Sequence, residues 1–314
     1  MERALAPWNA QRDHGTTWNS WNGPPLKGSQ RGPGTRFSAI GTPSGSWNAP
    51  SGLLELHSMK TIVIAAGYAT RLGELTKNFP KPLLKIGQST ILGRMLDDID
   101  AIPEIDEHII VTNHRFAQIF EDWAREQHYT KPITVIDDGT STNETRLGAV
   151  RDLQFAIEQR GIKDDMLVVA ADNLLFFSFQ GFVDFAKAKG TPCIMCHHQP
   201  DKAKLQRTGV VVLDDNNKVL NMEEKPAEPK STWAVPPFYI YKKDNIDLIM
   251  HAIENGCGFD APGNLAHYMV DNVEMHAWPM AGTGENLRFD IGSLDTYQEA
   301  CDKYGKVDSK NSLC

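Results

Sequence analysis

Residues 61–86 read TIVIAAGYATRLGELTKNFPKPLLKI. The stretch begins as an apolar run, continues as a loop of small residues that ends at Arg71, and closes on Pro80, Lys81 and Pro82. A strand that runs into Ala-Ala-Gly leaves backbone amides unpaired and uncrowded, and such amides bind phosphate groups by donating hydrogen bonds to their oxygens. We therefore expect a nucleoside triphosphate site here, with Arg71 and Lys81 as its cations. No Gly-Lys-Ser/Thr follows the glycine, which excludes the loop of P-loop proteins.

After this stretch, apolar runs typical of strands alternate with segments whose apolar residues recur at helical spacing. Strands are predicted near residues 61–65, 108–112, 133–136, 166–171 and 192–197, and helices near 91–100, 116–128, 147–159 and 179–189. This rhythm predicts an α/β fold with a mostly parallel sheet that is covered on both faces. Ligands of such sheets lie beyond the carboxyl ends of the strands.

The pattern changes after residue 200. Residues 209–213 and 219–223 flank an Asp-Asp-Asn-Asn turn and predict a β-hairpin, and residues 233–241 predict an extended segment. Helical spacing returns at 244–255 and at 293–304.

Composition places the chain among ordinary soluble globular proteins, with 41% hydrophobic and 23% charged residues in 314. No apolar run reaches the roughly eighteen residues of a membrane span, and no secretory pattern opens the chain, so the expected location is cytoplasmic. The residues after 58 carry a net charge of −10. Such an acidic body is a poor surface for nucleic acid, so we expect neither nucleic acid nor membrane as a partner.

The sequence predicts three parts: a disordered tail or extension at 1–58, a domain at 59–306, and a short tail at 307–314. Residues 1–58 contain six Pro, eight Gly and seven Ser and no periodic apolar stripe. Four of the seven tryptophans lie there, which is consistent with a docking segment for a partner. The favoured interpretation is an upstream extension of the reading frame, with Met59 as the working start.

The five cysteines form no regular framework, and an odd number favours reduced thiols. Cys193 and Cys196 have the spacing of a zinc knuckle or redox pair. However, they lie in a predicted strand, where residues three apart point to opposite faces, and no second pair exists. We therefore interpret them as buried strand residues.

Two aspartates are candidates to hold a divalent metal beside the triphosphate. Asp172 directly follows the buried strand at 166–171, and Asp290 lies where the extended segment Leu-Arg-Phe-Asp ends before Gly292. Mg²⁺ prefers one or two carboxylates together with phosphate oxygens. An aspartate at either position alone is more often a helix cap or a turn residue, and the metal is favoured only when the two are taken together with the loop.

The stretch 61–86 resembles the N-terminal signature of the sugar-phosphate nucleotidyltransferases of the glucose-1-phosphate thymidylyltransferase-like type, Gly-x-Gly-Thr-Arg followed by Pro-Lys-Pro. The matching positions are Gly67, Thr70, Arg71, Leu72, Thr76, Pro80, Lys81 and Pro82. Ala69 replaces the second glycine, and Glu74 stands where proline is frequent. The resemblance implies a Rossmann-like, three-layer α/β/α fold of the nucleotide-diphospho-sugar transferase type, with a sugar-binding part that contains the β-hairpin.

The resemblance also implies roles for residues further along the chain. Asp172 and Asp290 match the two aspartates that hold the catalytic magnesium, and Asn173 completes the Asp-Asn pair as a sugar-phosphate-binding residue. In Met-Glu-Glu-Lys-Pro, Lys225 matches the lysine that contacts the acceptor phosphate and Glu224 the glutamate that contacts sugar hydroxyls. Gly209 matches a glycine whose backbone meets the sugar, although Thr208 replaces the tyrosine before it. Pro237 stands in place of another glycine near the sugar, so local contacts there are expected to differ.

The base is expected to bind the loop at 137–148. The candidates there are Asp138, Asn143, Leu147 and Gly148, and Ala66 belongs to the nucleotide loop. Asn143 is equally consistent with a helix cap, and the identity of the base stays open.

From this resemblance we expect a Mg²⁺-dependent transferase that joins an NMP group from an NTP, dTTP or UTP by preference, to a sugar 1-phosphate such as glucose 1-phosphate. Arg71, Lys81 and Lys225 are the predicted catalytic residues. One alternative is a cytidylyltransferase acting on phosphocholine or a related phospho-alcohol, with Trp233, Phe238 and Tyr239 as candidate aromatics. Another is a non-catalytic sensor of sugar nucleotides. A homo-oligomer, dimer or tetramer, is expected because isologous assemblies are common.

Overall fold

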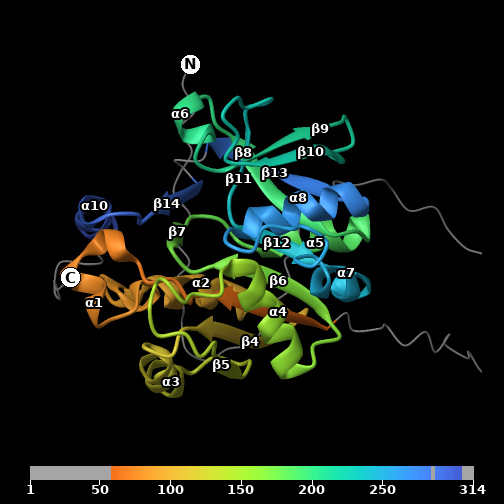
Figure 1. Ribbon diagram of the computed structural model, residues 1–314. Coiled ribbons are helices and arrows are strands. Elements are labelled where there is room, and N and C mark those ends of the chain that lie inside the picture. The colour runs from red at the N-terminus through yellow and green to blue at the C-terminus, as the bar shows by residue number, and fades with distance from the viewer. Residues whose placement is uncertain (1–57, 284–286, 306–314) are drawn as a thin grey trace, which may run out of the picture. The chain divides into compact units, whose positions relative to one another are not determined.

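The computed structural model describes residues 58–283 and 287–305 (Figure 1). The tails predicted at 1–58 and 307–314 lie outside these residues, apart from Ser58. Within the described residues, no helix combines the length and apolar character that a membrane span requires.

A ten-stranded sheet forms the centre of this part of the chain, in the order β10-β9-β11-β8-β12-β6-β1-β4-β5, with β13 paired to β8. Its strands are β1 (Met59–Ile64), β4 (Ile105–Thr112), β5 (Ile133–Asp137), β6 (Asp165–Ala170), β8 (Cys193–His198), β9 (Gly209–Leu213), β10 (Val219–Glu224), β11 (Trp233–Val235), β12 (Phe238–Tyr241) and β13 (His276–Thr283). β1 pairs in parallel with β4 and β6, and β4 with β5, whereas β12 joins β6 antiparallel. Two small sheets pair β2 (Lys85–Ile86) with β3 (Ser89–Thr90) and β7 (Asn173–Leu175) with β14 (Arg288–Asp290).

Helices cover both faces of the sheet. The helices of the described residues are α1 (Glu74–Lys77), α2 (Ile91–Ile99), α3 (Ala117–Glu126), α4 (Ala149–Arg160), α5 (Gln180–Lys189), α6 (Lys202–Leu205), α7 (Ile246–Met250), α8 (Pro262–Asn272) and α10 (Leu294–Tyr304). On one face α4, α7 and α8 pack with Ile62 and Ile109, and on the other α2, α3 and α5 pack with Val63 and Ile110. Alternate residues of β1 and β4 thus face opposite cores, as the two-residue period of a strand requires. The predicted three-layer α/β/α fold with a mostly parallel mixed sheet is confirmed.

A third apolar cluster lies beneath the loop at 65–72. It contains Leu72 of that loop, Leu174 of β7, and Ile291, together with Ala300 and Cys301 of α10. The side chain of Ser293 accepts a hydrogen bond from the Thr296 N–H, and a capping box starts α10 at this point. The cluster therefore anchors the neighbours of Arg71, Asn173 and Asp290, which come from three distant parts of the sequence.

The predicted elements differ from the structure mainly after residue 230. The extended segment at 233–241 forms two strands, β11 and β12, because Pro236 and Pro237 interrupt the ladder between them. The helix expected at 244–255 is reduced to α7. The extended segment expected before Gly292 is β14, whereas α8, β7 and β13 were not predicted. Cys193 and Cys196 are buried free thiols that belong to opposite cores, as predicted for strand residues.

Candidate active site

A cavity of about 450 Å³ opens beyond the carboxyl ends of β1 and β6. Seven of the predicted site residues line it, namely Gly67, Thr70, Arg71, Lys81, Asn143, Asp172 and Asp290. Its other walls include Tyr68, Arg146, Asp260 and Gly292. The phosphate loop and the two aspartates, which are far apart in the sequence, therefore line the same cavity.

The small-residue loop is held open toward this cavity. Ala69 adopts a left-handed conformation with φ 46° and ψ 40°, and its carbonyl accepts hydrogen bonds from the Thr76 hydroxyl at 2.9 Å and the Leu72 N–H at 3.0 Å. Gly67 is exposed, with open space where a Cβ would lie. The guanidinium of Arg71 is exposed and makes no hydrogen bond or ion pair with a residue in the described ranges. Arg71 is thus available to an anionic ligand.

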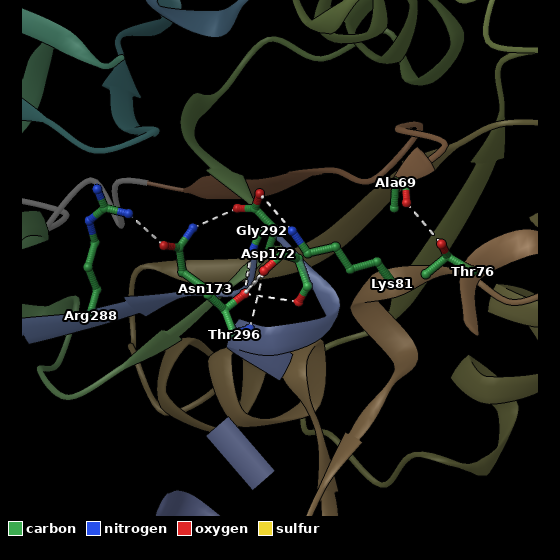
Figure 2. A network of polar contacts seen from close by, with 9 residues as sticks. Ala69, Thr76, Lys81, Asp172, Asn173, Arg288, Gly292 and Thr296 are labelled. Carbon is green, nitrogen blue, oxygen red and sulfur yellow. Dashed lines mark hydrogen bonds and ion pairs between the residues drawn. The ribbon is translucent and has the colours of Figure 1, made fainter. Parts of the chain in front are cut away.

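Lys81 is the buried cation of the site. It begins a short 3-10 turn, Lys81–Leu83, between Pro80 and Pro82, whose rings restrict the backbone on both sides. The side chain is only 11% exposed, and Nζ lies 3.2 Å from Asp172 Oδ2 (Figure 2). The lysine therefore points at the carboxylate predicted to hold the metal.

Asp172 and Asp290 are brought together by the pairing of β7 with β14. Asn173 lies opposite Asp290 in this ladder, and the Ile291 N–H donates to the Asp172 carbonyl at 3.2 Å. The Gly292 N–H donates to the Thr296 hydroxyl at 3.0 Å, which ties the end of β14 to α10 (Figure 2). Asp290 is exposed to the cavity, yet desolvation by the surrounding protein and then repulsion from Asp172 raise the pKa of its carboxyl.

These two carboxylates fit a divalent cation that is also bound by substrate phosphates. Among the described residues no group of three or more His, Cys, Asp and Glu side chains converges on one point. Mg²⁺ seldom needs such a cage, because it keeps several waters and takes one or two carboxylates with phosphate oxygens. A cation between Asp172 and Asp290 would remove the repulsion that now opposes ionisation of Asp290.

Three of the residues predicted to bind the sugar phosphate, Gly209, Glu224 and Lys225, lie around the end of β10, outside the set that lines the cavity. Glu224 faces Gly209 across the β9–β10 ladder, and its Oε2 is 3.2 Å from where a Cβ on Gly209 would lie and 1.9 Å from where one on Gly263 would lie. The two glycines therefore form a slot for this carboxylate, and desolvation there raises its pKa. Lys225 has a positive φ of 50°, its N–H donates to the Thr208 carbonyl at 3.1 Å, and Nζ lies 3.6 Å from Glu224 Oε1.

The loop expected to bind the base is only partly at the cavity. Asn143 lines the cavity and does not cap α4, whose N-cap is Gly148, so the alternative of a helix cap is wrong for α4. Asp138 is buried, with Oδ1 accepting from the Thr140 N–H at 2.7 Å. Ala66, Leu147 and Gly148 do not line the cavity either. The first two amides of α4, those of Ala149 and Val150, are already used within the protein, since they donate to the carbonyls of Asp260 and Phe259 at 3.2 and 3.0 Å.

The sequence reasoning missed four residues of the site. Arg146 and Asp260 line the cavity and form an ion pair at 3.0 Å, Gly263 holds Glu224, and Arg288 donates to Asn173. A signal existed for α8, since Pro262 stands at its first turn and Leu265, Ala266 and Met269 have helical spacing. Arg288 precedes Asp290 by two residues, and this spacing places both side chains on one face of a strand.

A cavity of about 450 Å³ at the carboxyl ends of the strands, lined by two cations and two carboxylates, is typical of the class of α/β proteins that bind ligands at this edge of the sheet. The sequence model of the nucleotidyl transferase family matches residues 60–307. The chain belongs to this family, and the resemblance to the sugar-phosphate nucleotidyltransferases is confirmed.

Individual relatives are distant. Glucose-1-phosphate adenylyltransferase of Fervidobacterium nodosum is 21% identical over 254 residues, 76% of this chain and 59% of the relative. UTP–glucose-1-phosphate uridylyltransferase of Synechocystis sp. is 28% identical over 252 residues, 77% of this chain and 62% of the relative. The chain thus spans about three fifths of the length of these relatives. The solved structure of a UDP-glucose pyrophosphorylase with UDP-glucose has the same fold, with a TM-score of 0.66 at 18% identity over 79% of this chain and 98% of that chain.

Proposed function

We propose that this protein transfers an NMP group from an NTP to a sugar 1-phosphate and releases pyrophosphate, with residues 59–306 as the transferase domain. The observation that carries the proposal is the cavity in which the exposed guanidinium of Arg71, the ammonium of Lys81 and the carboxylates of Asp172 and Asp290 converge. A site with cations alone could bind many kinds of anion. A site that also has two carboxylates can bind a triphosphate together with its divalent metal, because the cations contact the phosphates and the carboxylates contact the metal.

The reaction is an in-line displacement at the α-phosphorus. An oxygen of the sugar phosphate forms a bond to the α-phosphorus, the bond from that phosphorus to the bridging oxygen breaks, and pyrophosphate leaves with the electron pair. The attacking phosphate is already ionised, so no general base is required, and catalysis rests on positioning and charge neutralisation. Arg71 and Lys81 stabilise the charge on the triphosphate, and Lys225 fixes the incoming phosphate.

Asp172 and Asp290 would hold Mg²⁺, which would neutralise charge on the reacting phosphates when bound. Gly209 and Glu224 would meet the sugar phosphate. Asn173 was expected to do so, but it is 2% exposed and its amide is bonded to Arg288 and Asp172, so we assign it no contact with the substrate. Ala66, Gly67 and Thr70 would meet the nucleotide, and the loop carrying Asp138, Asn143, Leu147 and Gly148 would meet its base.

Glucose 1-phosphate is the acceptor to test first, because the adenylyltransferase and the uridylyltransferase above both carry it in their names. Their nucleotides differ, and we favour UTP or dTTP. Phosphocholine has no comparable support. Phe238 and Tyr239 are buried in opposite cores and leave no aromatic box for a quaternary ammonium at that strand.

The experiment incubates purified protein and Mg²⁺ with each of dTTP, UTP, CTP, ATP and GTP against glucose 1-phosphate, mannose 1-phosphate and phosphocholine, and follows pyrophosphate release. Release with a sugar phosphate and one or two pyrimidine triphosphates is expected. Release only with CTP and phosphocholine would favour the phospho-alcohol alternative. Nucleotide binding without any release would favour the sensor.

A further inference from the structure

Arg288 lies beside the metal-site carboxylates without lining the cavity. It is the first residue of β14, and in the ladder with β7 it faces Leu175 while Asp290 faces Asn173. Residues two apart on a strand share a face, so Arg288 is the diagonal neighbour of Asn173, within reach of a long side chain. The guanidinium donates from NH1 to Asn173 Oδ1 at 2.7 Å.

The contact continues toward the cavity as a chain of polar groups (Figure 2). Asn173 Nδ2 donates to Asp172 Oδ1 at 2.6 Å, and Asp172 Oδ2 accepts from Lys81 Nζ at 3.2 Å. Both oxygens of the Asp172 carboxylate are therefore held, one by a catalytic cation and the other through Asn173.

The chemistry of the end groups permits only one orientation of the Asn173 amide. A guanidinium only donates and an ionised carboxylate only accepts, so the amide must present its oxygen to Arg288 and its nitrogen to Asp172. Asn173 is 2% exposed, so water does not replace a lost partner there. Without Arg288 the amide is free to flip, and a flipped amide would turn its oxygen against the carboxylate.

The charge of Arg288 is matched to the same carboxylates. Asp172 and Asp290, which carry the opposite charge, both lie near its guanidinium. The Nε atom is buried with no partner in the described residues. Removing this charge from water therefore costs free energy, which attraction to the two carboxylates offsets. A residue with only a packing role would not need this charge.

We propose that Arg288 is a positioning residue which, through Asn173, fixes the Asp172 carboxylate in the orientation that holds the divalent metal. The inference deepens the proposed function and rests on it for the metal's role in the reaction. Arg288 touches neither substrate nor metal. Arg71, in contrast, is exposed at the cavity and can contact the substrate directly.

The test measures Mn²⁺ binding by the electron paramagnetic resonance signal of the free ion, without substrates. Asp172→Asn provides the blank, and Arg94→Met is the matched control. Within the described residues, the Nε of Arg94 is also buried without a partner, and its guanidinium donates to the Ile86 carbonyl at 2.6 Å, away from the carboxylates. Loss of a partner that orients a metal ligand weakens metal binding about tenfold to a hundredfold, and this is expected for Arg288→Met. Arg94→Met should bind like the wild type.

Two outcomes would overturn the proposal: Arg288→Met binding Mn²⁺ as tightly as Arg94→Met, or the wild type binding no more tightly than Asp172→Asn. If Arg288→Met does not fold, Arg288→Lys carries the test, since it keeps the charge and loses the fork that reaches Asn173; unchanged Mn²⁺ affinity in that variant would also overturn it.

A double-mutant cycle tests the route through Asn173. If Arg288 acts through Asn173, adding Arg288→Met to Asn173→Leu should weaken Mn²⁺ binding no further, whereas additive losses contradict the route. Because no substrate is used, these results stand even if no NTP and sugar phosphate release pyrophosphate, which would refute the proposed function alone.

Discussion

The two sides of the site are held together differently. On the nucleotide side, formed by residues 65–72, Lys81, Asp172 and Asp290, the 11% exposed Lys81 is bonded to Asp172, and Asp172 to Asn173. On the acceptor side, formed by Gly209, Glu224, Lys225 and Gly263, the Lys225 side chain is 57% exposed, and its ion pair with a described residue is a 3.6 Å contact to Glu224. Lys81 and Asp172 are thus fixed by neighbouring groups of the protein itself, whereas we expect Lys225 to be oriented by its ligand.

This difference predicts different kinetic signatures. A group that is fixed in advance acts on charge that develops in the transition state, so its loss lowers kcat. A group that is ordered by the substrate contributes to binding as well, so its loss also raises KM. The following predictions run from the largest expected effect to the smallest.

Replacing Lys81 should have the largest effect. Lys81→Ala removes a buried cation from the triphosphate and leaves Asp172 without its ion pair. Loss of one such contact costs about 2.7–4 kcal/mol of barrier, or roughly a hundredfold to a thousandfold in kcat. Steady-state pyrophosphate release measures it, with exposed Lys85→Ala as control. Near-normal turnover by Lys81→Ala would remove Lys81 from the catalytic residues.

Replacing Lys225 should act mainly on the acceptor. Lys225→Ala loses a charge-assisted hydrogen bond to the incoming phosphate, of about 1.5–3 kcal/mol in kcat/KM, with a higher KM for the sugar phosphate. Lys230→Ala is the control, because Lys230 is exposed and pairs with Glu223 instead. A fall in kcat with KM unchanged would show that the two sides do not differ in the way described.

Asp152 tests how the stability of the fold beside the site depends on pH. This carboxyl lies on α4, is 4% exposed, and has its pKa raised to about 8 by desolvation first and Asp138 second. The folded protein therefore keeps a proton that the unfolded chain loses, so this group makes stability fall as pH rises from about 4 to 8.

Asparagine is neutral at every pH, so Asp152→Asn should remove this slope and raise the free energy of unfolding at pH 8 by more than about 1 kcal/mol, because one pKa unit corresponds to about 1.36 kcal/mol. Urea unfolding at pH 5 and pH 8 measures it, with exposed Asp215→Asn as control. An unchanged slope in Asp152→Asn would contradict the assignment.

Gly263 tests the slot on the acceptor side. A Cβ there would lie 1.9 Å from Glu224 Oε2, so Gly263→Ala must displace the carboxylate, which is the end of a flexible side chain. We expect little change in unfolding midpoint and about a tenfold rise in KM for the sugar phosphate, equivalent to about 1.4 kcal/mol. Equal rises in KM for the NTP and the sugar phosphate would argue against a specific role of Glu224.

Ala69 should give the smallest effect. The left-handed conformation costs alanine about 1–2 kcal/mol in the folded protein, and glycine would not pay this cost. Glycine is also freer than alanine in the unfolded chain, which cancels up to about 1 kcal/mol of that gain. Ala69→Gly should therefore stabilise the protein by less than about 1 kcal/mol in urea unfolding. Asn217→Gly, at a φ of 64°, is the control and should gain less, because asparagine tolerates this region. A clear loss of stability in Ala69→Gly would contradict the strain.

The sequence predicted the nucleotide side better than the acceptor side for a physical reason. The phosphate loop and Lys81 are encoded within one continuous stretch, and Asp172 follows a strand whose burial is visible in its composition. The partners of Glu224 and Asn173 are not local, since Gly263 and Arg288 reach them only through the packing of α8 and the pairing of β14 with β7. Local periodicity carries no information on such contacts.

The most direct test of the central claim follows the α-phosphorus itself. Each of the five NTPs, labelled at the α-phosphorus, is incubated with Mg²⁺, glucose 1-phosphate and either wild type or Lys81→Ala, and the products are separated by chromatography. We predict that the label of one or two NTPs moves into the NDP-glucose with wild type and stays in the NTP with Lys81→Ala. Label that stays in all five NTPs with wild type, or appears as NMP, would contradict transfer at this cavity.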